Sequence, residues 1–286
     1  MVVPVTRGLA TEALVPTEAL DAARIRAELG EPQAARLERL EVLEEVDSTN
    51  LRLLATPPPP LGRAGVCIAE WQTAGRGRQG RRWLAPSGSG ITLSVGWCFG
   101  GSASAPALSL AAGVAIVRAL TRVGALGVKL KWPNDVWLAD RKLGGVLIEQ
   151  QGEGSGSLHT VIGVGVNVAL TAQMRREIEE TGVRVASVAD ACGETPSRNR
   201  LAGALIDELI AALVEFERAG FGAFRAAWSS HDALLDRPAR LLAGERTLTG
   251  RARGVDLDGA LLLDTGDRVQ RVMSGEVSLR PGEPDA

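Results

Sequence analysis

Residues 91–97 alternate strictly between apolar and small side chains, and this period of two limits the possible folds more than any other stretch. The apolar positions are Ile91, Leu93, Val95 and Trp97, and between them lie Thr92, Ser94 and Gly96. Such alternation predicts a β-strand with one face in a hydrophobic core. A chain that contains this strand needs a sheet and a layer that covers its apolar face.

Other strand-like runs are joined by turn signals that fit hairpins, such as Ala139-Asp140-Arg141. The predicted strands cover 66–71, 91–97, 128–132, 136–138, 142–150 and 161–168. The predicted helices follow Ser48-Thr49-Asn50, begin at Pro106, and cover 201–216 and 221–228. Strands that come mostly before helices favour an α+β fold, with a mixed or antiparallel sheet and flanking helices, over a doubly wound fold.

The character of the chain changes after Pro238. Five short strand-like runs follow, separated by turn signals: 239–242, 247–253, 260–263, 269–273 and 277–279. Short strands at such tight spacing predict a small barrel of roughly fifty residues. We therefore expect a partly helical leader over 1–39, a main domain over 40–235 and a small barrel domain over 236–286.

Composition and charge argue against several classes of protein. The net charge is −2, so the chain lacks the broad basic surface of a dedicated DNA- or RNA-binding protein. The three cysteines form no Cys-x-x-Cys pair, which argues for a reduced, cytoplasmic protein without disulfides or zinc. The two histidines give little basis for His-based triads or metal sites. No signal peptide is apparent, and Ala105 to Leu120 is too short and too polar to cross a membrane.

A segment rich in arginine and glycine is the strongest candidate site. Between Gln72 and Trp83 it carries Arg76, Arg78, Arg81 and Arg82 among Gly75, Gly77 and Gly80. Glycines let backbone N–H groups turn toward a ligand, and guanidinium groups suit phosphate and carboxylate oxygens. We expect a loop that orders around an anion, and Trp83 either stacks on a base or packs the hinge. The pattern leaves open an exposed Arg/Gly loop that binds RNA with little specificity.

The second candidate site joins Lys131-Trp132-Pro133-Asn134-Asp135 to Lys142-Leu143-Gly144-Gly145. Two hairpin arms would bring Asn134 and Asp135 to one end of the sheet, with Lys142 on the returning strand. A lysine there can neutralise charge that builds on a carboxylate or an α-phosphate, and Asp135 suits Mg²⁺. Ordinary turn residues and a solvated lysine are the alternative explanation.

The third candidate is Gly163-Val164-Gly165-Val166-Asn167-Val168. It lacks the strand-to-helix setting and the third glycine of a dinucleotide-binding fingerprint. We expect its glycines to let the strand approach a ligand closely, with Asn167 offering a donor and an acceptor to a base. Ser48-Thr49-Asn50 reads locally as a helix cap only.

Together these segments resemble the biotin–protein ligase family, in the form without an N-terminal DNA-binding domain. The matching blocks are 47–50, 70–81, 131–135, 141–145 and 163–167. The resemblance implies a class II synthetase-like catalytic domain followed by an SH3-like barrel. It also implies an ATP-dependent ligase that makes biotinyl-5′-AMP from biotin and MgATP, then passes biotin to a lysine of a biotin carboxyl carrier domain.

The resemblance also implies roles for individual residues. Lys142 and Arg78 would be catalytic, and Asp135 would hold Mg²⁺. The biotin site would comprise Ser48, Thr49, Asn50, Gln72, Gly75, Arg76, Gly77, Arg78, Lys142 and Gly145. The ATP site would comprise Arg78, Arg81, Trp83, Asn134, Lys142 and Asn167. A lipoate–protein ligase is the nearest alternative enzyme.

Relatives that repress transcription carry an N-terminal winged helix, for which the leader is too short. We therefore expect no specific DNA binding, no membrane association, and a monomer or weak homodimer.

Overall fold

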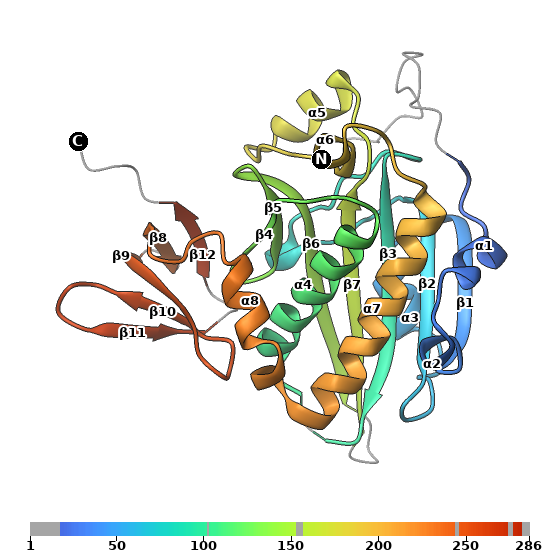
Figure 1. Ribbon diagram of the computed structural model, residues 1–286, viewed down its shortest axis with the longest axis horizontal. Coiled ribbons are helices and arrows are strands. Elements are labelled where there is room, and N and C mark those ends of the chain that lie inside the picture. Colours follow the sequence, from blue (N-terminus) through green and yellow to red (C-terminus); the bar gives the residue numbers. More distant parts are fainter. Residues whose placement is uncertain (1–17, 102, 153–156, 244–245, 274–276, 282–286) are drawn as a thin grey trace, which may run out of the picture.

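The computed structural model describes residues 18–101, 103–152, 157–243, 246–273 and 277–281. Two sheets organise these residues (Figure 1). The larger has seven strands in the order β1-β2-β3-β7-β6-β5-β4, and the smaller has five in the order β11-β10-β9-β8-β12. In the larger sheet β1 runs parallel to β2 and every other neighbouring pair is antiparallel. The predicted α+β class with a mixed sheet is confirmed.

The strands of the larger sheet follow the predicted runs, with one addition. Their bounds are β1 Leu37–Val46, β2 Ala64–Gln72, β3 Gly90–Phe99, β4 Val128–Lys131, β5 Asp135–Leu138, β6 Arg141–Gly152 and β7 Leu158–Asn167. Strand β1 was not predicted, because its alternating charged side chains (Glu38, Arg39, Glu41) hide the apolar period. It begins at Leu37, inside the expected leader, so the sheet starts before the predicted main domain. The division of the chain into 1–39, 40–235 and 236–286 stays a prediction.

Strand β3 is buried along its whole length, and the prediction of a single buried face is wrong. All ten residues from Gly90 to Phe99 are buried. Helices α4 and α7 cover one face of the sheet (Figure 1), while α3 packs on the other against β2, β3 and β7. The small polar residues of β3 therefore point into the protein. Thr92 donates to the Ala69 carbonyl at 2.9 Å, and Ser94 lies under α3.

The helices include two long ones that pack against each other. Their bounds are α1 Ala22–Ala27, α2 Glu31–Ala34, α3 Thr49–Leu54, α4 Ala105–Arg122, α5 Ala172–Glu179, α6 Val188–Cys192, α7 Arg198–Ala219 and α8 Arg225–His231, with 3₁₀ turns η1 Arg78–Gly80 and η2 Phe221–Ala223. Ser197 caps α7 by accepting from the Arg200 amide. The sequence analysis missed α5 and α6. The helix predicted over 221–228 is instead η2 followed by α8.

Helix α4 corrects one reason given against a membrane span. Its 18 residues are long and apolar enough to cross a bilayer by length and composition, and 72% of that window is buried inside the protein. It packs against β6 of the sheet and beside α7 as a core helix.

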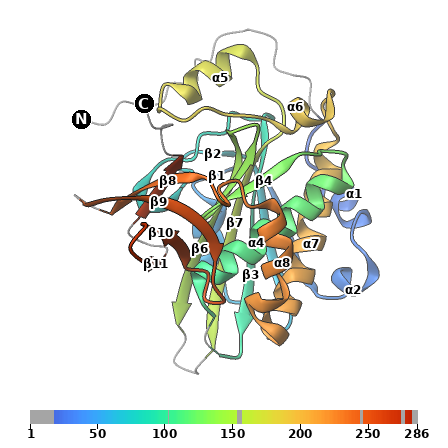
Figure 2. The ribbon, with the colours of Figure 1, turned by 60° about the vertical axis from the view of Figure 1, so that its left-hand side comes forward.

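The smaller sheet contains the five strands predicted after Pro238. They are β8 Pro238–Ala243, β9 Arg246–Val255, β10 Leu261–Asp264, β11 Val269–Val272 and β12 Val277–Pro281, all antiparallel. Figure 2 shows this sheet beside α8. Its turn at Asp258-Gly259 touches the main domain, where Trp132 donates to the Gly259 carbonyl at 2.9 Å. This antiparallel C-terminal domain is consistent with the predicted SH3-like fold.

Candidate active site

A cavity of about 1200 Å³ lies on the α3 side of the larger sheet. Helix α3, the arginine-rich loop, strands β4 to β7 and the segment 178–185 all contribute to its wall. The predicted ligand residues that line it are Ser48, Thr49, Asn50, Gln72, Arg76, Gly77, Arg78, Arg81, Trp83, Asn134, Asp135, Lys142, Gly145 and Asn167. Gly75 does not line the cavity and lies at the base of the loop.

The arginine-rich loop is closed into a narrow hairpin over this cavity. The Trp83 amide donates to the Gly75 carbonyl at 3.0 Å, and the Gly77 amide donates to the Arg81 carbonyl at 2.7 Å. Arg76 and Arg82 pair across it as an isolated antiparallel bridge. These bonds fix the base of the loop, where Gly75 pairs with Trp83. We call this pair the neck of the loop.

Arg78 reaches from the loop toward the second candidate site. Its Nη1 lies 3.4 Å from Oδ1 of Asn134. Burial lowers the pKa of Arg78, an effect that nearby Asp135 opposes and nearby Arg81 reinforces. An arginine keeps its charge under such a shift, so Arg78 presents a partly desolvated positive group to the cavity.

Polar side chains gather at the α3 end of the cavity. Oε1 of Gln72 accepts from the Thr49 amide at 2.9 Å and from the Thr49 hydroxyl at 3.2 Å. Ser94 donates to Oγ1 of Thr49 at 2.7 Å. Ser48 occupies the N-cap position of α3, but its buried side chain makes no capping hydrogen bond. The cap interpretation is therefore correct for the position of Ser48 only, and Ser48 lines the cavity.

Glu149 joins α3 to the arginine-rich loop. It accepts from Asn50 Nδ2 at 2.8 Å and forms an ion pair with Arg76 at 3.0 Å. Neither Glu149 nor Ser94 was predicted. The available signal was a single charged or polar side chain within an apolar strand. For Ser94, the sequence analysis predicted only that the opposite face of its strand is buried.

Gly163 and Gly165 of β7 line the cavity, and protein side chains also lie against them. A Cβ on Gly163 would lie 2.3 Å from Oδ1 of Asn50, and one on Gly165 would lie 2.4 Å from the Trp83 ring. Trp83 thus rests on β7, which supports its hinge interpretation. Its Nε1 is buried without a hydrogen-bond partner among the described residues.

Lys142 lies across Gly145 toward the start of β5. Its Nζ is 2.6 Å from Oδ1 of Asp135 and 5.9 Å from the centre of the Trp83 ring. The other Asp135 oxygen is 3.9 Å from Nζ of Lys131. Two hairpin arms bring these side chains together as the sequence predicted.

The Asp135 carboxylate is a limited metal ligand in this setting. Among the described residues, no group of three His, Cys, Asp or Glu side chains could enclose a metal ion. Mg²⁺ is commonly held by one or two carboxylates together with substrate phosphates. The more weakly paired Oδ2 of Asp135 fits an ion that arrives bound to phosphates.

Both predicted asparagines have their amide groups bound to the protein. Asn134 donates to the Val146 carbonyl at 2.7 Å, and Asn167 donates to the Ala186 carbonyl at 3.0 Å. The segment beyond α5 also pairs with the backbone of Lys142, which donates to Arg184 and accepts from Ala186. This segment forms a wall of the cavity that the sequence analysis missed.

Comparison with known proteins gives this geometry a family. Residues 42–167 match the Biotin/lipoate A/B protein ligase family, and residues 234–280 match the biotin protein ligase C-terminal domain. The bifunctional ligase/repressor BirA of Escherichia coli is 41% identical over 244 residues, which cover 85% of this chain and 74% of that protein. The chain belongs to the biotin protein ligase family.

Two further relatives agree with this membership. The biotin–[acetyl-CoA-carboxylase] ligase of Mycobacterium tuberculosis is 36% identical over 254 residues, covering 84% of this chain and 88% of that protein. The structure of the Aquifex aeolicus biotin protein ligase in complex with biotin and ATP matches with a TM-score of 0.70 and 28% identity. It covers 86% of this chain and 100% of that one. Membership of this family does not favour either alternative, the lipoate–protein ligase or the RNA-binding protein.

Proposed function

We propose that this chain is an ATP-dependent ligase that activates biotin as biotinyl-5′-AMP and transfers it to a lysine of a biotin carboxyl carrier protein. One observation carries the proposal. Uncharged hydrogen-bonding groups on α3 and β2 share a single cavity with Arg78 and Lys142. A ligand with a polar uncharged head and an anionic tail matches that arrangement, and its tail would meet the positive groups.

The α3 end of the cavity suits the ureido ring of biotin. Ser48, Thr49 and Gln72 offer hydroxyl, amide and carbonyl groups that can pair with the N–H and C=O groups of that ring. The contacts of Gln72 and Ser94 with Thr49 hold its side chain in one orientation before a ligand binds. Such preorganisation reduces the entropy lost on binding.

The first chemical step needs positioning and charge stabilisation more than a base. A biotin carboxylate oxygen, already ionised at neutral pH, attacks the α-phosphorus of ATP. The new oxygen–phosphorus bond forms as the bond to pyrophosphate breaks. Lys142 and Arg78 stabilise the negative charge on the phosphoryl oxygens, while Arg81 faces the triphosphate. Mg²⁺ bound to ATP would neutralise further phosphate charge, with Asp135 as its one protein carboxylate.

The second step transfers the acyl group. A deprotonated lysine amine of the carrier protein attacks the acyl carbon. The bond to the AMP oxygen breaks, AMP leaves, and the nitrogen releases one proton as the amide forms. Until then the mixed anhydride must be kept from water. The arginine-rich loop, whose neck is fixed at Gly75 and Trp83, would cover it.

The test is a reconstitution with purified protein, biotin, ATP and a carrier domain. We expect pyrophosphate release that requires biotin, and biotin on the carrier lysine detected by blotting. Pyrophosphate release without biotin would contradict the mechanism. Salt-sensitive RNA binding with no heat of biotin binding would support the RNA alternative.

We further propose that the chain works in the cytoplasm as a monomer or weak homodimer, without specific DNA binding or membrane association. Its three free cysteines support a reducing compartment. Sedimentation at working concentration and a titration with promoter DNA test the remaining statements.

A further inference from the structure

We propose that Arg198 is a positioning residue for the arginine-rich loop, because it clamps the two strand ends between which residues 73–89 depart and return. The inference rests on the proposed role of that loop as the cover of the adenylate. Arg198 lies in the first turn of α7, outside the cavity, and no part of the mechanism above uses it.

The burial of Arg198 needs an explanation. The residue is 1% exposed, although arginine is rarely buried unless it is paired. Its Nη2 is 2.6 Å from Oε2 of Glu70, and this ion pair compensates its charge. A buried pair of this kind is weak evidence for stability alone, so its placement is the informative feature.

Arg198 connects two strands at a point where they no longer pair with each other. Strands β2 and β3 pair in register only as far as Ala69 and Thr92. Glu70 lies one residue beyond that last pair, on a part of β2 that still pairs with β1 as far as Gln72, and Gly90 is the first residue of β3. Arg198 donates to the Gly90 carbonyl through Nε at 3.3 Å and Nη2 at 3.1 Å while it binds Glu70. One guanidinium thus bridges β2 and β3 beyond the end of their ladder, near the base of the loop.

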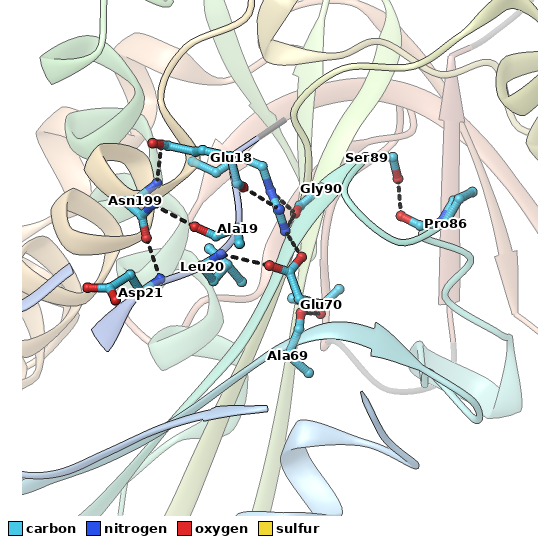
Figure 3. A network of polar contacts seen from close by, with 12 residues as sticks. Glu18, Ala19, Leu20, Asp21, Ala69, Glu70, Pro86, Ser89, Gly90 and Asn199 are labelled. Carbon is cyan, nitrogen blue, oxygen red and sulfur yellow. Dashed lines mark hydrogen bonds and ion pairs between the residues drawn. The ribbon is translucent and has the colours of Figure 1, made fainter. Parts of the chain in front are cut away.

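The same group also binds the start of the described chain. Nη1 of Arg198 donates to the Glu18 carbonyl at 3.1 Å, and the Leu20 amide donates to Oε1 of Glu70 at 2.7 Å. Figure 3 shows Glu18, Leu20, Glu70 and Gly90 drawn together in this network. Asn199 ties the segment down further through the Ala19 carbonyl and the Asp21 amide. Residues 18–21 are therefore part of the anchor.

The anchor acts on the cavity through short covalent connections. Gln72 is two residues beyond Glu70, and Gly75, the hinge of the loop, is three residues further. On the return side, the Ser89 carbonyl accepts from Val168 at 2.8 Å and from Ala169 at 3.0 Å, which fixes the residue before Gly90. A shift at Glu70 or Gly90 would be passed to the neck of the loop.

Arg198→Lys and Glu70→Gln test the anchor. A lysine keeps the charge but cannot bind Glu70, Gly90 and Glu18 in the planar fork of a guanidinium. We expect a non-hydrolysable biotinyl-adenylate analogue to dissociate about 10- to 100-fold faster from Arg198→Lys, because small misplacements of a closing loop have effects of that size. Trypsin should also cut several-fold faster after Arg76, Arg78, Arg81 and Arg82, with and without the analogue.

Two control variants separate positioning from stability. Arg200→Lys changes an exposed arginine two residues along α7 and should behave like the wild type. Leu213→Ala removes a buried side chain from the same helix. It should lower the melting temperature without changing loop cleavage at 25 °C or analogue release. Arg78→Gly changes the loop itself and serves as a reference. Its rate of analogue release is the rate expected when the loop no longer covers the adenylate.

Wild-type release and cleavage rates in folded Arg198→Lys and Glu70→Gln would overturn the anchor, as would the same loss of protection in Leu213→Ala. If Arg198→Lys does not fold, Glu70→Gln decides the question. A wild-type protein that does not bind the analogue would contradict the proposed function instead. Tryptic cleavage of the unliganded loop would then decide the anchor by itself.

Discussion

Among single side chains, Lys142 is held in a fixed position, and that position supports its proposed catalytic role. Asp135 restrains its Nζ at 2.6 Å, and its stem packs over Gly145, where a Cβ would lie 3.5 Å from Cε. We expect Lys142→Ala to lower the rate of biotinyl-AMP formation by about 10²- to 10³-fold, the usual loss when one electrostatic stabiliser is removed. Single-turnover formation of labelled adenylate measures this rate.

The stability of Lys142→Ala should change little, because Lys131 still lies near Asp135. Lys129→Ala is a suitable control, since that lysine is exposed and its Nζ bonds the Ser230 carbonyl away from the cavity. Adenylate formation at the wild-type rate in Lys142→Ala would remove Lys142 from the mechanism.

Among the secondary-structure elements, β7 helps to set the position of the arginine-rich loop through Gly165. The Trp83 ring occupies the space of a side chain there, so Gly165→Ala would push the neck of the loop away from the sheet. We expect at least a tenfold higher KM for ATP, together with a loss of stability of about 1–3 kcal/mol from overpacking. Gly152→Ala on β6 is the matched control, because nothing lies within 4 Å of its Cβ position. Equal ATP affinity in both variants would contradict this role of Gly165.

The elements also show how far sequence reasoning reaches. Period-two runs gave six of the seven strands of the larger sheet and all five of the smaller, since alternation and turn residues are local signals. Strand β1 was missed because charged side chains are interspersed along an edge strand. The pairing of Glu149 with Asn50 and Arg76 could not be predicted, since no local pattern states which strand lies under α3. Gly163 and Gly165 were correctly noticed as close-approach positions, but the approaching groups were side chains from distant segments.

Across the whole molecule, Asp232 makes the junction between the two sheets sensitive to pH. It lies between α8 and β8, next to Leu130 of β4. Burial raises the pKa of Asp232 to about 6, which hydrogen bonds from Leu234 and Leu235 only partly oppose. Because the folded pKa is above the unfolded value, the carboxyl's contribution to stability is present below pH 4 and is lost as the pH rises through about 6.

Asp232→Asn should therefore remove part of the pH dependence of unfolding. At pH 8 we expect it to be more stable than the wild type by about 1–3 kcal/mol, since one pKa unit corresponds to about 1.4 kcal/mol. At pH 4 the two proteins should differ much less. Urea unfolding at both pH values measures the difference, and an equal loss of stability at both would show that the charge of Asp232 has no such effect.

The contact between the C-terminal sheet and the main domain should also affect catalysis, because it meets the segment that carries Asn134 and Asp135. Trp132 of that segment donates to the Gly259 carbonyl, and a Cβ on Gly259 would lie 2.9 Å from the backbone of Ala107. Gly259→Ala should displace the turn and lower kcat/KM for ATP by about tenfold, equal to about 1.4 kcal/mol.

Gly266→Ala is the control variant that isolates the cause, because both glycines have positive φ values (+82° and +93°) but Gly266 has no neighbour within 4 Å. Both variants place a side chain at a positive φ, so the same loss of kcat/KM in both would assign the effect to backbone strain. A loss confined to Gly259→Ala would assign it to the docking of the C-terminal sheet.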